Sequence, residues 1–247
     1  MKVWIEKPVE PAKLVLVWQA PEGHPDRLRW AVGVIELEEV ERFRYLTSDE
    51  LFALNNGRTL DRLTAAGFAG YPAFSYEPGK MFDADILRTF QRRLPPPARQ
   101  DFARYEEYFS IHPGSTISVP LLLSLTEARL PSDGFSIIDP LDSSVEVCDA
   151  VFEIAGLRYE GAAQRIEIGD ELALRPDPTN TYDPHSVAVH WRGARIGFVN
   201  WLQAHAVAQW LSTRSVRCVV LRKNGRADAP RAYAKIAVRP RPHQLAA

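Results

Sequence analysis

The carboxy-terminal part of the chain is patterned as short strands. Runs of four to six residues there are rich in β-branched side chains or alternate apolar with polar positions, which is typical of β-structure. These runs cover residues 171–174, 186–191, 216–221 and 233–238. Turn-forming residues separate them, at Arg192-Gly193 and over 223–228. We therefore expect this part to be mostly β-sheet.

One segment within it follows a helical period instead. Leu202, Ala206 and Trp210 recur at helical spacing after Asn200. Asparagine is a preferred residue at the position that precedes a helix, because its side chain accepts a backbone hydrogen bond from the first turn. The sequence predicts one helix that starts just after Asn200.

The amino-terminal part mixes both patterns. It predicts strands at 13–18, 30–35 and 41–46, a helix over 83–94 that consecutive prolines end, and a second helix over 99–109. Turn-rich residues between 131 and 150 break every apolar period and predict the domain boundary. The expected fold class is α+β, with an α+β domain at 1–140 and a β-rich domain at 150–240.

Three motifs stand in order along the β-rich domain. Gly156-Leu157-Arg158-Tyr159 comes first, and Asn180-Thr181-Tyr182-Asp183 lies in a proline-punctuated loop that runs into a strand. Arg195-Ile196-Gly197-Phe198-Val199 then precedes the predicted helix. Together they resemble the HIRAN domain over about residues 152–239. That resemblance implies a small OB-like β-barrel with one or two helices, which binds free 3′ ends of single-stranded DNA.

The resemblance also implies which residues would contact DNA. They are Arg158, Tyr159, Asn180, Tyr182 and Asp183. Phe198 and Trp201 depart from the family pattern, since end-binding relatives have a polar ring and a basic group at these positions, but both rings could extend the stacking surface. The residue types suit the task, since aromatic rings stack on bases for roughly 1–3 kcal/mol per base. A carboxylate accepts a hydrogen bond from a 3′-hydroxyl and repels a 3′-phosphate.

Five of these side chains also fit a purely structural role. Asn180 and Asp183 flank prolines, where such side chains commonly close their own turns. Tyr182 is equally suited to capping the barrel as a buried aromatic. Phe198 and Trp201 fit core positions or a docking patch for another protein. The glycines Gly156 and Gly197 fit a bulge or a close backbone approach better than a ligand contact.

A second resemblance concerns the amino-terminal part. Gly33-Val34-Ile35, Phe43-Arg44-Tyr45 and the segment 90–95 are similar to the amino-terminal subdomain of HipA-like toxin kinases over about residues 14–125. No kinase core follows in this sequence, so the resemblance implies no activity.

Charge divides the chain. Residues 1–151 carry 16 basic and 23 acidic side chains, a net charge of −7, whereas residues 152–247 carry 14 and 8, a net charge of +6. The basic part suits a polyanion, and the acidic part suits a protein partner.

We expect a bacterial protein of the cytoplasm without membrane association, since no apolar run approaches the roughly 18 residues of a membrane span. The amino terminus does not resemble a secretory signal, and the two cysteines suggest no disulfide framework.

The sequence contains none of the common catalytic or cofactor-binding motifs, so neither enzymatic activity nor a cofactor or metal is expected. The function predicted is recognition of single-stranded DNA 3′ ends, in DNA repair or replication restart. Two alternatives stay open. One is a protein-interaction module in a toxin–antitoxin or stress context, and the other is a divergent nuclease or hydrolase.

Overall fold

A computed structural model describes residues 2–25, 27–130, 132–157, 165–226 and 229–241, and it contains two compact units. The N-terminal unit comprises Glu10–Phe102 and Thr116–Pro140. The C-terminal unit comprises Met1–Val9, Ala103–Ser115 and Leu141–Ala247. The sequence predicts two consecutive domains, but the units interleave, because two segments of the amino-terminal part belong with the C-terminal sheet.

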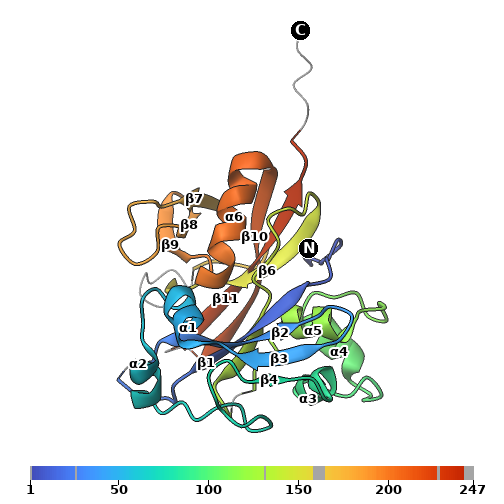
Figure 1. The fold of residues 1–247 in the computed structure, drawn as a ribbon. Coiled ribbons are helices and arrows are strands. Elements are labelled where there is room, and N and C mark those ends of the chain that lie inside the picture. The colour runs from blue at the N-terminus through green and yellow to red at the C-terminus, as the bar shows by residue number, and fades with distance from the viewer. Residues whose placement is uncertain (1, 26, 131, 158–164, 227–228, 242–247) are drawn as a thin grey trace. The chain divides into compact units, whose positions relative to one another are not determined.

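The N-terminal unit is built on a five-stranded antiparallel sheet with the order β4-β3-β2-β1-β5 (Figure 1). Its strands are β1 (Lys13–Gln19), β2 (Arg29–Glu36), β3 (Arg42–Tyr45), β4 (Met81–Phe82) and β5 (Phe135–Ile138). Its helices are α1 (Ser48–Leu54), α2 (Leu60–Ala65), α3 (Ile86–Gln91) and α5 (Val119–Thr126). The structure confirms the three strands that the sequence predicts here. The helix predicted over 83–94 is shorter, since only α3 forms.

The strand β5 corrects the sequence-based interpretation of residues 131–150 as a connecting segment. All four of its residues are buried, and it pairs antiparallel with β1 from Trp18↔Phe135 to Val15↔Ile138. A four-residue strand between turn-rich segments gives too short a pattern to detect. The chain leaves the N-terminal unit for the last time after Pro140.

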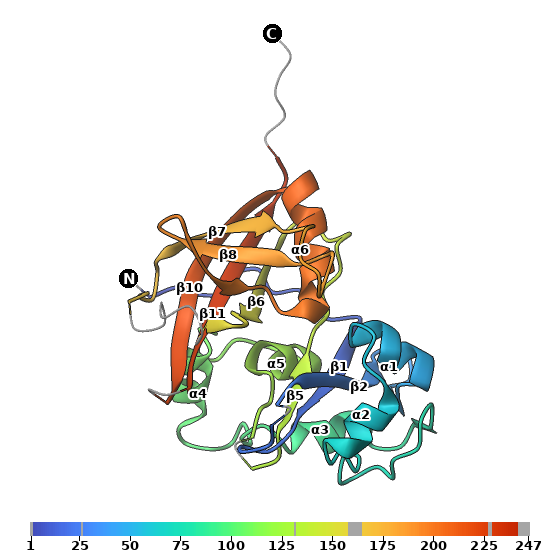
Figure 2. The ribbon, with the colours of Figure 1, turned by 90° about the vertical axis from the view of Figure 1, so that its left-hand side faces the viewer.

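The C-terminal unit contains a six-stranded sheet with the order β6-β11-β10-β7-β8-β9, in which every pair is antiparallel. The strands are β6 (Cys148–Glu153), β7 (Glu171–Pro176), β8 (Val187–Trp191), β9 (Ala194–Phe198), β10 (Ser215–Arg226) and β11 (Ala229–Arg239). The helix α6 (Trp201–Thr213) lies against β7, β8 and β10 (Figure 2). The Oδ1 atom of Asn200 accepts a hydrogen bond from the backbone N–H of Leu202 at 3.1 Å, which confirms the predicted start of this helix.

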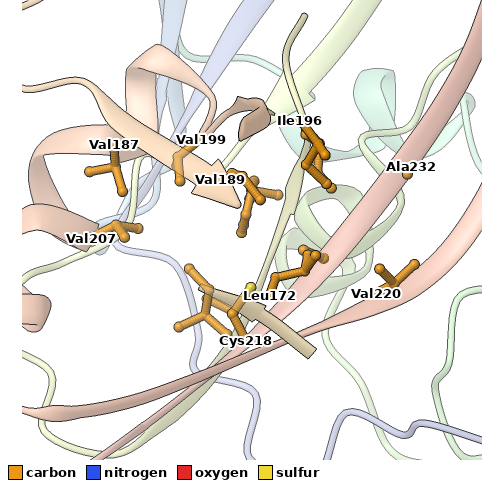
Figure 3. Close-up of a cluster of buried hydrophobic side chains, with 14 of the residues drawn as sticks. Leu172, Val187, Val189, Ile196, Val199, Val207, Cys218, Val220 and Ala232 are labelled. Atoms are coloured by element: carbon orange, nitrogen blue, oxygen red, sulfur yellow. The ribbon is translucent and has the colours of Figure 1, made fainter. Parts of the chain in front are cut away.

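Alternate residues of these strands point into a common core. Val187 and Val189 of β8 belong to the same buried cluster as Leu172 of β7, Ile196 of β9 and Val220 of β10 (Figure 3). Val207 and Trp210 of α6 belong to the same core. The residues between them on each strand therefore lie on the opposite, outer face of the sheet.

Other segments of the chain cover part of this outer face, on β10 and β11. The guanidinium group of Arg222 lies 3.8 Å from the ring centroid of Tyr233 and 4.6 Å from that of Phe109, which follows α4 (Phe102–Tyr108). The Nζ atom of Lys235 donates to the carbonyl oxygen of Trp4 at 2.7 Å. These contacts explain why residues 2–9 and 103–115 belong to this unit.

Asp149 anchors the first of these segments. Its carboxylate, whose side chain is fully buried, accepts from the backbone N–H of Glu6 at 2.8 Å and from Arg239 at 2.8 Å, and it lies 3.5 Å from Lys235. Burial opposes ionisation of the carboxyl group, but the Glu6 N–H and the two cations outweigh it and lower its pKa. A buried charge therefore ties the amino-terminal segment to β6 and β11.

The two ends of the six-stranded order approach each other at one residue pair. Ala155, just beyond β6, forms an antiparallel bridge with Phe198 of β9 through backbone hydrogen bonds of 2.8 and 2.9 Å. One bridge joins the edges at a single point and does not amount to a continuous closed barrel, so the predicted OB-like barrel stays a prediction.

Among the described residues, no helix has the length and apolar character that crossing a membrane requires.

Candidate functional site

Backbone pairing brings three predicted segments to one end of the C-terminal sheet. The bridge with Phe198 places Ala155 beside the end of β9, three positions before Arg158. The next residue, Val199, donates its N–H to the carbonyl oxygen of Val187 at 2.9 Å, where β8 begins. The loop 177–186 and the start of α6 therefore lie at the same end as residues 155–157. Arg158 and Tyr159 themselves lie outside the described residues.

The loop 177–186 is held in shape by Asn180. Its Oδ1 accepts from the N–H groups of Tyr182 at 2.9 Å and Asp183 at 3.3 Å, and its Nδ2 donates to the hydroxyl of Ser186 at 3.2 Å. The side-chain oxygen is thus committed to turn formation, which is one of the two roles that the sequence allows. A role of Asn180 in DNA contact stays a prediction.

Asp183 also helps to close the loop, and its carboxylate has a second oxygen that is able to accept a hydrogen bond from a ligand. One carboxylate oxygen, Oδ1, accepts from the N–H of His185 at 2.8 Å. Within the described part of the chain, no hydrogen bond reaches the other oxygen, and the residue is only partly buried. An ionised carboxylate has several acceptor sites, so Asp183 is able to hold the turn and accept a hydroxyl donor together.

Tyr182 lies at the tip of this loop with 84% of its surface exposed. The alternative of a buried barrel cap is therefore wrong for this side chain. Burial usually stabilises a tyrosine, whereas an exposed ring on a loop braced by its own hydrogen bonds is available to stack on a partner.

Phe198 and Trp201 are half-buried where β9 ends and α6 starts. The guanidinium group of Arg195 lies 5.1 Å from the ring centroid of Phe198, within cation–π range. The loop 177–186 also contacts α6, since the rings of His185 and His205 meet edge to face with centroids 4.8 Å apart. Aromatic groups from the loop, the strand and the helix thus gather at this end of the sheet.

Gly197 allows β9 to approach the segment that follows β6. Gly197 has a φ of 155°, and β9 changes register against β8 beside it. A Cβ atom there would overlap the carbonyl oxygen of Ala155 and lie 2.7 Å from Cγ2 of Ile154. The predicted use of this glycine for a bulge and a close approach is confirmed, although its partner, Ala155, has no sequence signal. Gly156 also has a positive φ, of 79°.

The described residues contain no group of three or more histidine, cysteine, aspartate or glutamate side chains that could hold a metal ion. Both cysteines, Cys148 and Cys218, are buried free thiols. Burial raises the pKa of the Cys218 thiol far above its usual range, which disfavours the reactive thiolate form.

The charge difference persists when the residues are grouped by structural unit. The C-terminal unit carries 17 basic and 14 acidic side chains, a net charge of +3, and the N-terminal unit carries 13 and 17, a net charge of −4. The difference is smaller than between the sequence halves, because residues 141–151, with three acidic and no basic side chains, belong to the C-terminal unit, whereas residues 1–9 and 103–115 together add no net charge. The unit that contains the candidate site is still the basic one.

Comparison with known proteins identifies this region. The family model of the HIRAN domain matches residues 147–238, which confirms the predicted resemblance for this segment. Among solved structures, the HIRAN domain of human HLTF is similar at 22% sequence identity over 36% of this chain and 74% of that chain, with a TM-score of 0.32. A protein from Lactobacillus plantarum is similar at 17% identity over 36% of this chain and 98% of that chain, with a TM-score of 0.30. No curated protein matches the chain. The resemblance of the amino-terminal part to HipA-like kinases stays a prediction.

Proposed function

We propose that this protein binds 3′ ends of single-stranded DNA through its HIRAN segment and catalyses no reaction itself. The observation that carries the proposal is the pairing of a solvent-exposed ring, Tyr182, with a carboxylate, Asp183, on one braced loop. The ring offers a stacking surface for the last base, and the open carboxylate oxygen accepts from the terminal hydroxyl. The match of residues 147–238 to the HIRAN family supports this assignment.

The proposed setting is DNA repair or replication restart in a bacterial cytoplasm. The protein would recruit other factors to an end or protect the end from degradation. Any remodelling of DNA would then be done by a partner, and the acidic N-terminal unit offers a surface of opposite charge to the DNA-binding unit for such a partner.

Fluorescence anisotropy with short labelled single strands tests the proposal directly. Strands that end in a 3′-hydroxyl should bind more tightly than the same strands with a 3′-phosphate. If about four phosphates are neutralised, the logarithm of the affinity should fall with the logarithm of salt concentration with a slope near −3. Absence of binding even at low salt would contradict the proposal and favour a protein-docking module.

The Tyr182→Ala variant should weaken binding by about 1–3 kcal/mol because a stacked base loses its platform. The fold should be unchanged, since the side chain is exposed. Tyr182→Phe keeps the ring and should bind nearly as well as the wild type. Tyr108→Ala removes another exposed tyrosine, on α4, and serves as the control. Equal affinity of Tyr182→Ala and the wild type would exclude stacking at this position.

Asp183→Asn should reduce the preference for a 3′-hydroxyl over a 3′-phosphate by about tenfold, because the charge that repels the phosphate is gone. The amide oxygen is still able to accept from His185, so the loop should keep its shape. Asp177→Asn is the matched control, since this carboxylate lies in the same loop and accepts from the hydroxyl of Thr179 at 2.8 Å. An unchanged preference in Asp183→Asn, measured by anisotropy on both strands, would rule out this role.

A further inference from the structure

We infer that a bound single strand leaves the 3′-end site along the outer face of β7, β8 and β9, where its phosphates meet Arg175 and Arg195. This inference rests on the proposed function and adds the path of the strand. The surface is defined by Arg175, His190, Arg195 and Phe198, and we term it the arginine face.

The register of the three strands sets these residues side by side. Ala188 of β8 pairs with Arg175 on one side and with Phe198 on the other. His190, two positions further along β8, pairs with Arg195. Directly paired residues share a face of the sheet with Cβ atoms about 5 Å apart, and a step of two residues advances about 7 Å along the strand. The arginine face thus starts beside the candidate end site, at Phe198, and continues toward the turn between β8 and β9.

The change of register beside Gly197 is what aligns Arg195 with Phe198. Residues three apart on a regular strand point to opposite faces. The irregularity between Val189 and His190 shifts the pairing by one residue, so both side chains lie on the outer face. Their contact, 5.1 Å between the guanidinium carbon and the ring centroid, agrees with this placement.

The arginine face is open, unlike the parts of β10 and β11 that other segments of the chain cover. Residues 2–9 and 103–115 cover β10 and β11, but Arg175 and Arg195 are exposed. Among the described residues, no acidic side chain forms an ion pair with Arg175. Several other cations of this sheet already have acidic partners, as in the pairs Arg217–Glu171, Arg231–Glu153 and Arg239–Asp149. The charge of Arg175 is thus available beside the candidate site.

The other direction away from the end site lacks this chemistry. The helix α6 contains no charged residue from Trp201 to Thr213 apart from the titratable His205. Phosphate binding depends on Lys and Arg, because neutralisation of phosphates and release of their counterions supply most of the sequence-independent affinity. Charge complementarity and continuity with Phe198 both favour a single strand on the arginine face.

Strand length and salt dependence test the path with the full-length protein. We would compare a trinucleotide with a dodecanucleotide, both ending in a 3′-hydroxyl, on the wild type and on Arg175→Gln/Arg195→Gln. The wild type should bind the longer strand more tightly. The double variant should lose roughly tenfold in affinity for the longer strand at low salt and little for the shorter one, and its log–log salt slope should become shallower by about 1.4. The control Arg88→Gln/Arg92→Gln removes the same charge from exposed sites of the N-terminal unit and should leave both affinities unchanged.

The outcomes separate the two proposals. If neither strand binds, or if a 3′-phosphate binds as well as a 3′-hydroxyl, the proposed function fails and the path fails with it. If end-specific binding persists but length brings no gain, or the double variant keeps that gain, only the path is overturned. An equal loss in the control would attribute the effect to net charge and would also overturn the path.

Discussion

Gly197→Ala is expected to lower the free energy of unfolding of the C-terminal unit by about 2–4 kcal/mol and to abolish most 3′-end binding. The added Cβ would overlap the backbone of Ala155 and approach Ile154 to 2.7 Å, in a backbone conformation, φ 155°, that L-residues rarely adopt. Relief of this overlap requires β9 to move from Ala155. That movement would separate the segment 155–157 from Phe198, so stability and binding should fall together. Denaturant unfolding followed by tryptophan fluorescence gives the first quantity, and anisotropy gives the second.

Gly193→Ala is the matched control. Gly193 also has a positive φ, of 84°, but a Cβ atom there would meet no other atom within 4 Å. Its replacement should therefore show only the cost of the strained backbone, about 1–2 kcal/mol, and should preserve 3′-end binding. Similar losses of stability and of binding in both variants would show that the close approach of β9 to Ala155 does not maintain the site.

The sequence predicted best those features that arise from local patterns. The strands β7 and β8 and the helix α6 follow from apolar spacing and from one capping residue, Asn200, all of which act within a few residues. The distal part of β10 has no such local signal. The composition of residues 223–226 predicts a turn, but these residues continue the strand and pair with β11. Extended pairing with a neighbouring strand outweighed the local turn preference.

The interleaving of the two units could not be predicted from the sequence. The contact between Arg222 and Phe109 joins residues more than one hundred positions apart, and no periodicity relates them. The same holds for Asp149, whose partners include a backbone N–H near the amino terminus. Such contacts depend on the tertiary arrangement alone.

For the candidate site, the resemblance named the segments, and the structure shows which of their side chains brace the loop and which are exposed. Asn180 and Asp183 both brace the loop 177–186, whereas the ring of Tyr182 is displayed to solvent. A sequence motif does not separate these roles, because turn-forming and ligand-binding residues are the same types. Exposure and the number of satisfied acceptors distinguish them.

Asp149→Asn should destabilise the C-terminal unit by about 2–4 kcal/mol at neutral pH, because it leaves Lys235 and Arg239 near a buried site without a countercharge. The pKa of this carboxyl group is lowered in the folded protein, so its stabilising contribution is present above the unfolded value, about 3.9, and is lost as the pH falls through the lower folded value. The difference in the free energy of unfolding between the wild type and Asp149→Asn should therefore be constant from pH 7 to about 5 and should shrink below about pH 4. Urea unfolding at a series of pH values measures it.

Asp142→Asn provides the comparison. This exposed carboxylate also has a lowered pKa, through its hydrogen bonds with Ser144, but it has no buried cations to leave unpaired among the described residues. Its replacement should cost much less stability at neutral pH.

Asp149→Asn should also expose the amino-terminal segment 2–9 to proteolysis, since the hydrogen bond from the N–H of Glu6 weakens when its acceptor loses the charge. Wild-type stability and unchanged proteolysis in Asp149→Asn would show that this segment is held without the buried charge.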